Sequence, residues 1–166
     1  ASSIINLVLL IISALAILAA IFAPQVVRYI LAPGFVNDPE KFQLTVQLLR
    51  IILPSTVIFS ISGLMMGILN AHQSFLFPAL APSMYSLGMI FGVVFLSPSM
   101  GVFGLAWGVV LGASLHLLVQ VPKLFRLGGN YWPILGLDYP SVRQVGTLML
   151  PRLAGVAVVP LNFLVN

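Results

Sequence analysis

Charged side chains are almost absent from this chain. Only 6% of its 166 residues are Asp, Glu, Lys or Arg, and the stretch from Ile51 to Pro122 contains none of them. A soluble domain carries roughly 25% charged residues, because its surface must stay hydrated. The stretch is also much longer than the roughly 20 residues that cross a bilayer. It therefore excludes an ordinary soluble domain and predicts three consecutive membrane-spanning helices joined by short loops.

Cysteine is missing, and acidic residues are scarce. The chain has no cysteine and three acids, two of which, Asp38 and Glu40, share one short polar segment. Disulfides and thiolate metal sites are thereby excluded. A membrane enzyme acting on pyrophosphate substrates needs grouped carboxylates to hold a metal, and the sequence has no such group. We therefore expect no catalytic residue, no metal and no cofactor, with a coupling ion or the membrane potential left open as driving force.

Hydrophobic residues make up 60% of the chain and fall into five long runs. The runs are continuous rather than alternating, which favours helices over a membrane β-barrel. The predicted fold is an all-α polytopic membrane bundle of about five helices. The expected spans are residues 3–31, 50–70, 75–96, 102–122 and about 141 to the end. The first apolar run begins near the start of the chain, where there is no Met, and the last run continues to the end of the chain without a polar tail. We therefore expect the chain to be a piece of a longer protein.

Two polar connectors separate these spans. In residues 32–50, turn formers precede apolar side chains at helical spacing, which predicts a short amphipathic helix over 40–50 lying in the membrane interface. Residues 123–143 carry three cations and one acid, a balance that weakly favours the cytoplasmic side. The net charge of +4 fits contact with anionic lipid headgroups. The phospholipid bilayer is therefore an expected partner, and nucleic acid is not.

Small residues recur at every fourth position of several spans, and prolines lie inside them. Small faces let helix backbones approach closely, whereas a proline removes a backbone donor and bends a helix. Plain bundle packing is the favoured explanation, and a rocking seam of a transporter is the sharper one. The helix-packing and hinge candidates are Gly34, Pro54, Gly63, Gly67, Pro78, Pro82, Gly104, Gly108, Gly112 and Pro151.

Polar side chains within the last span are candidates for lining a substrate cavity. Arg152 lies about one turn or more into the span, and Asn162 and Asn166 share one face further along. A forked guanidinium suits an anionic group such as a phosphate, but Arg152 could equally snorkel to the headgroups. His116 continues the glycine face of residues 104–112, where bonding to a neighbouring helix is favoured over a proton relay.

Several of these segments resemble the MurJ (MviN) family of lipid II flippases. The similar segments are Ala32-Pro-Gly-Phe35, Arg50-Ile-Ile-Leu-Pro54, Gly67-Ile-Leu-Asn-Ala-His-Gln-Ser-Phe75, Pro78-Ala-Leu-Ala-Pro82, Leu148-Met-Leu-Pro-Arg-Leu-Ala-Gly155 and Leu161-Asn-Phe-Leu-Val-Asn166. The resemblance covers essentially the whole chain. It implies the MOP exporter superfamily, whose members have fourteen helices in two lobes around a central cavity.

The resemblance implies a place for each part of the chain. Residues 1–122 would be part of the N-terminal lobe, with a periplasmic connector at 32–50. Residues 123–143 would be a cytoplasmic connector, and 144–166 the truncated first helix of the second lobe. The chain would then be helices three to seven, partnered by the remaining helices of the same parent chain.

The implied activity is transport rather than bond chemistry. Such a flippase translocates lipid II, an undecaprenyl-pyrophosphate-linked peptidoglycan precursor, from the inner to the outer leaflet of the bacterial cytoplasmic membrane by alternating access. Two positions depart from the family pattern: Ser86 stands where Asn is common, and Asn166 where some members carry an acid, which argues against a sodium site. The family's main cationic substrate contacts lie on helices outside this chain.

Three other functions remain as alternatives. Another polysaccharide flippase or a drug exporter of the same superfamily would share the fold, although the Pro-Gly-Phe and Gly-Ile-Leu-Asn-Ala segments argue against it. A membrane-embedded glycolipid enzyme would need intramembrane carboxylates, which the sequence lacks. A non-catalytic assembly subunit would leave the proline-rich helices and Arg152 without an explanation.

Overall fold

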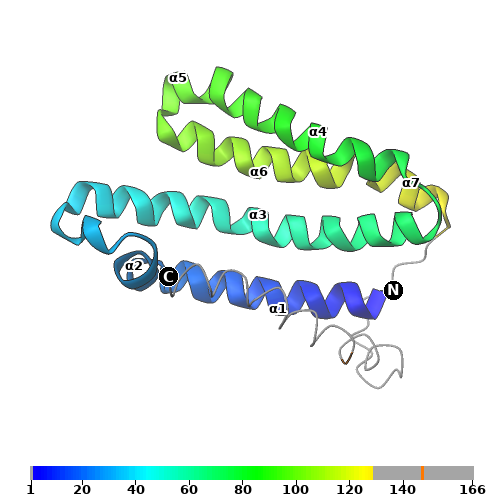
Figure 1. Ribbon diagram of the computed structural model, residues 1–166, viewed down its shortest axis with the longest axis horizontal. Helices are drawn as coiled ribbons and strands as arrows, with labels where there is room; N and C mark the ends of the chain where they lie inside the picture. Colours follow the sequence, from blue (N-terminus) through cyan, green and yellow to red (C-terminus); the bar gives the residue numbers. More distant parts are fainter. Residues whose placement is uncertain (1, 129–146, 148–166) are drawn as a thin grey trace, which may run out of the picture. The chain divides into compact units, whose positions relative to one another are not determined.

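Helices account for all regular structure in the part of the chain that the computed structural model describes, residues 2–128 and Thr147 (Figure 1). In chain order the elements are α1 (Ser2–Ile21), α2 (Ala23–Val26), the π-helical turn η1 (Val27–Leu31), the 3-10 helix η2 (Pro33–Asn37), α3 (Pro39–Ala71), α4 (Leu76–Phe91), the π-helical turn η3 (Gly92–Leu96), α5 (Ser97–Met100), α6 (Val102–Leu118) and α7 (Val121–Arg126). The all-α prediction is confirmed. The predicted fifth span lies outside the described residues.

Four of these helical segments are long and apolar enough to cross a membrane. They cover Ser3–Ile21, Pro39–Ala71, Leu76–Met100 and Val102–Arg126. Each overlaps one predicted span, so the polytopic prediction is confirmed for the described part of the chain. The first span was predicted over residues 3–31, but its helix ends at Ile21, just before Pro24. The chain divides into two compact units, residues 8–130 and residues 1–7 with 131–166. The contacts described below lie within residues 8–130.

The second span differs from its predicted form. Residues 40–50 are helical, but they continue directly into the span as one 33-residue helix, α3, instead of forming a separate interfacial helix. Asp38 caps this helix, because its carboxylate accepts a hydrogen bond from the Lys41 backbone nitrogen at 3.2 Å. With about 1.5 Å per residue, α3 is about 50 Å long and exceeds the roughly 30 Å of a hydrocarbon core. The polar first turns therefore continue the axis of the span beyond the core.

The turns between the later spans are shorter than the sequence suggests. The predicted spans 75–96 and 102–122 leave residues 97–101 as a loop, but α5 keeps this segment helical as far as Met100, and the chain reverses at Gly101. Gly101 has φ +60 and ψ −134, a conformation that only glycine adopts readily. The chain also stays helical through Pro54 and Pro82, which lie inside α3 and α4. Residues 123–126, expected in a connector, belong to α7.

Small residues fill the interior, and large apolar residues face outward. Helix α6 lies between α3 and α4 (Figure 1) and packs against both of them. Its buried residues are Gly104, Ala106, Gly108, Gly112, Ala113 and His116. Side chains such as Leu15, Phe95 and Leu118 are more than half exposed instead. This distribution suits a protein surrounded by lipid, where helices associate through close packing of small residues.

Candidate functional site

The closest helix contact is a glycine seam between α4–η3 and α6. Gly88 and Gly92 on one side face Gly104, Gly108 and Gly112 on the other. A Cβ atom added to Gly92 would lie 2.8 Å from the Gly104 carbonyl oxygen and 3.0 Å from the Gly108 nitrogen, whereas ordinary contacts begin near 3.4 Å. The neighbours are backbone atoms, so no side chain can rotate away. The seam therefore requires glycine and joins the two helices as a pair.

The glycines of α3 are in a different environment. Atoms added as Cβ to Gly63 or Gly67 would meet nothing within 4 Å among the described residues, and the same holds for Gly34 in η2. The sequence pattern alone could not distinguish this open face from the seam, because both have glycine at four-residue spacing. Among these glycines, those with a close backbone neighbour therefore lie in α4, η3 and α6, and those of α3 and η2 have none among the described residues.

A buried polar cluster of Ser62, His116 and Gln120 joins α3 to the end of α6. Ser62 and Gln120 are 0% exposed, and His116 is 8% exposed. The Ser62 hydroxyl oxygen lies 2.6 Å from Nδ1 of His116. The Gln120 amide nitrogen donates to the Ser62 oxygen at 2.7 Å and to the His116 carbonyl oxygen at 2.9 Å. The expected bond of His116 to a neighbouring helix is therefore confirmed.

The hydrogen bonds of the Gln120 amide nitrogen limit the roles that the other atoms of the cluster can take. Because the Gln120 amide nitrogen donates to the Ser62 oxygen, the Ser62 proton can point to Nδ1 of a neutral His116. The Gln120 Oε1 atom is buried without a hydrogen-bond partner among the described residues. An unmet buried acceptor costs about 1–3 kcal/mol. The cluster thus serves as a polar latch between helices, with one acceptor left over.

Aromatic rings extend this contact to α4. The Phe59 ring stands edge-on to the Tyr85 ring, with centroids 5.1 Å apart, and edge-on to His116 at 5.3 Å. Tyr85 in turn covers Gly112, since a Cβ added there would lie 2.6 Å from the Tyr85 carbonyl oxygen. One side chain from each of α3, α4 and α6 therefore meets at this level of the bundle. Such edge-to-face pairs contribute about 0.5–1.5 kcal/mol beyond their buried area.

A second polar contact joins α3 to the end of α1. Pro24 has no N–H, so the carbonyl of Ala20, four residues earlier, loses its helical donor. The Arg50 Nε atom donates to this Ala20 oxygen at 3.0 Å. A cation near a helix C-terminus also meets the negative end of the helix dipole. Arg50 therefore satisfies a carbonyl that the proline leaves open, and it fixes the register of the two helices.

The other predicted site residues fall into two groups. Pro54 lies within α3, and Pro78 and Pro82 lie within α4, where Ser86 Oγ donates to the Pro82 carbonyl oxygen at 3.2 Å. The remaining candidates lie outside the described residues, namely Pro151, Arg152, Asn162 and Asn166. Sequence reasoning did not select Ser62, Gln120 or Arg50. The four-residue spacing of His116 and Gln120 on one helix face was the available signal for part of the latch.

Comparisons with known proteins point to one family. The family model described as "Lipid II flippase MurJ" matches residues 1–166. The chain is 34% identical over 148 residues to the lipid II flippase MurJ of Burkholderia cenocepacia, covering 84% of this chain and 28% of that protein. It is 33% identical over 166 residues to the probable lipid II flippase MurJ of Bdellovibrio bacteriovorus, covering 97% and 31%. The probable lipid II flippase MurJ of Buchnera aphidicola subsp. Acyrthosiphon pisum is 33% identical, covering 92% and 30%. The chain thus spans less than a third of these relatives.

Proposed function

Because the chain belongs to the lipid II flippase MurJ family, we propose that the whole protein carries lipid II from the inner to the outer leaflet of the bacterial cytoplasmic membrane. The observation that carries this proposal is the family match over residues 1–166. Four apolar helices among the described residues support an integral membrane protein. The substrate is the peptidoglycan precursor, and the step is transport without bond chemistry.

In this proposal the described helices act as one wall of a transporter lobe. The glycine seam brings the backbones of α4 and α6 into contact, so in this proposal the two helices move as a pair. The latch of Ser62, His116 and Gln120 ties this pair to α3. Alternating access then requires this wall to move against helices outside it. Binding of the substrate shifts the balance between the two resulting conformations. No cofactor enters this scheme, and the driving force is a coupling ion or the membrane potential.

The pyrophosphate of lipid II needs cationic partners, and the uncharged stretch from Ile51 to Pro122 cannot supply them. Arg152 is the cation that lies about one turn or more into the last predicted span, and Asn162 and Asn166 are polar side chains further along the same span. A guanidinium can bind a phosphate with two parallel hydrogen bonds. We therefore assign Arg152 as a candidate pyrophosphate contact, and the other helices of the parent chain supply the remaining contacts.

Depletion of the whole protein in its host tests the function. Lipid II should accumulate in the inner leaflet, and cells should lose their shape. Normal lipid II distribution after depletion would overturn the proposal. Complementation with Arg152→Ala tests the contact, with Arg152→Lys as a control that keeps charge but loses the fork. If Arg152→Ala restores growth at normal membrane levels, the pyrophosphate contact is wrong although the flippase assignment stands.

A further inference from the structure

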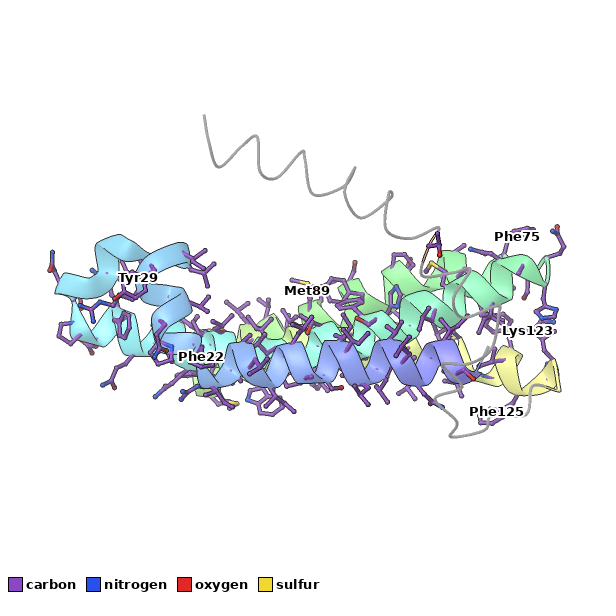
Figure 2. All side chains as sticks on the ribbon, turned by 90° about the horizontal axis from the view of Figure 1, so that it is seen from below. Phe22, Tyr29, Phe75, Met89, Lys123 and Phe125 are labelled. Carbon is purple, nitrogen blue, oxygen red and sulfur yellow. The ribbon has the colours of Figure 1, made fainter. Side chains whose placement is uncertain are left out.

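Residues 22–31, named the elbow here, leave the axis of α1 at one end of the bundle. The elbow comprises Phe22, helix α2 and the π-helical turn η1. In Figure 1, α2 is seen end-on beside the end of α1, whereas α1 lies across the picture. In Figure 2, Phe22 and Tyr29 lie at one end of the helices, and Phe75, Lys123 and Phe125 lie at the other. The chain therefore turns sideways where α1 ends.

Helix lengths place the bilayer boundary at the start of the elbow. Helix α1 has 20 residues without charge, and the uncharged part of α3 runs from Ile51 to Ala71. Each is about 30 Å long, which matches the thickness of a hydrocarbon core. The hydrogen bond from Arg50 to Ala20 sets the ends of these two apolar stretches side by side. Both stretches thus end at the same boundary. Phe22, the residue after the end of α1, begins the elbow.

The inner side of the elbow is packed onto α3. Ala23 and Val27 are 0% exposed, and together with Val46, which is 7% exposed, they form a small apolar core. Phe42 and Leu49 of α3 complete this core. The core residues of the elbow follow Ile21 and those of α3 precede Ile51, so this core lies at the ends of the two uncharged stretches. The elbow is therefore a fixed part of the fold.

The outer side of the elbow combines large apolar groups with one cation. Phe22 is 51% exposed, Tyr29 72% and Ile30 68%. The Arg28 guanidinium lies 5.8 Å from the centroid of the Tyr29 ring, and Arg28 is the first charged residue of the chain. Aromatic rings with an apolar body and a polar tip, next to arginine, are typical of the headgroup level of a membrane. The acids Asp38 and Glu40 lie further along, at the start of α3.

We propose that the elbow lies in the interface of the bilayer that α1 and α3 cross. Phe22, Tyr29 and Ile30 insert at the boundary of headgroups and acyl chains, and Arg28 faces phospholipid phosphates. The charge of Arg28 is complementary to those phosphates, and no acid of the chain precedes Asp38 to repel them. This inference concerns how the protein sits in the membrane and does not depend on its substrate.

Labelling depth tests the proposal in the whole protein reconstituted in phosphatidylglycerol–phosphatidylethanolamine vesicles. Because this chain has no cysteine, single variants Ile30→Cys, Ile17→Cys and Gln43→Cys can carry a nitroxide once cysteines elsewhere are replaced. Ile17 is 60% exposed within α1, and Gln43 is exposed near the start of α3. They serve as lipid and water references. The depth of each nitroxide is measured as the ratio of its accessibility to oxygen over its accessibility to a water-soluble nickel chelate. This ratio rises with depth in the bilayer.

For Ile30→Cys we expect an oxygen-to-nickel accessibility ratio several-fold above that of Gln43→Cys and below that of Ile17→Cys. A ratio equal to that of Gln43→Cys would place the elbow in water and overturn the proposal. A label shielded from both oxygen and the nickel chelate would also overturn it, because other helices of the protein would then cover the elbow. A matched variant, Ala23→Cys, should be shielded from both reagents, since Ala23 is packed in the small core.

Discussion

The glycine seam makes a sharp prediction for Gly92→Ala. The added methyl group would lie 2.8 Å from the Gly104 carbonyl oxygen and 3.0 Å from the Gly108 nitrogen, against an ordinary minimum near 3.4 Å. The Gly108 Cα atom would be closer still, so the helices must part by about 1 Å, and contacts along the seam weaken, since dispersion falls steeply with distance. Inserting one methyl group into a close-packed site costs about 1–3 kcal/mol. We expect the free energy of unfolding of Gly92→Ala to fall by this amount relative to a glycine-to-alanine change at an open helix position.

Gly63→Ala is the matched control, because it makes the same chemical change in a helix interior. Nothing lies within 4 Å of its added Cβ among the described residues. Both variants gain the same helix propensity, about 1 kcal/mol for alanine over glycine. The difference between them therefore isolates the contact across the seam. The measurement is unfolding of the whole protein in mixed micelles by a denaturing detergent, followed by circular dichroism. Equal stability of the two variants would refute close backbone contact at Gly92.

Three further changes have defined outcomes. Ser62→Ala removes the partner of both His116 and the Gln120 amide, so we expect a loss of about 1–3 kcal/mol in the same unfolding measurement, and unchanged stability would contradict the latch. Arg50→Gln leaves the Ala20 carbonyl without its guanidinium donor, and we expect faster backbone hydrogen exchange at the end of α1, with Arg50→Lys giving partial protection. The hydrogen bonds from Lys41 lower the pKa of Asp38 below its usual 3.8. A lowered pKa stabilises the folded form above pH 3.8, and this contribution is lost as pH falls through the folded pKa. The first turn of α3 should therefore fray as the pH falls below 3.8, while Asp38→Asn should show no such pH step.

Sequence reasoning recovers the large features of this fold because bilayer physics leaves few choices. Continuous apolar runs must be helices, since each backbone N–H and C=O needs an internal partner in lipid. The interfacial helix predicted over residues 40–50 fails for a related reason. Its apolar residues, including Val46, pack against Val27 of the elbow, and the segment continues into the span as one helix. Periodicity identifies an apolar face but does not name what that face touches.

The contacts between distant helices were less accessible to sequence reasoning. Ser62 and His116 come from helices separated by a complete intervening span, and the sequence holds no signal of their register. The open environment of Gly63 likewise differs from that of Gly108 only through neighbours in space. Arg50 was partly foreseeable, because a proline at position 24 always leaves the carbonyl of residue 20 without its helical donor. That Arg50 supplies the replacing donor could be known only from the structure.

The hairpin of α4, η3, α5 and α6 has a consequence for biosynthesis. Its two arms follow one another directly, with the reversal at Gly101 and the seam pairing Gly92 with Gly108 across a few turns of chain. Contacts so local in sequence form quickly, before distant segments are available. The two arms can therefore leave the insertion machinery as an assembled pair. Pulse-chase measurements should then show seam variants failing in membrane yield at the time of synthesis, before any transport step is reached.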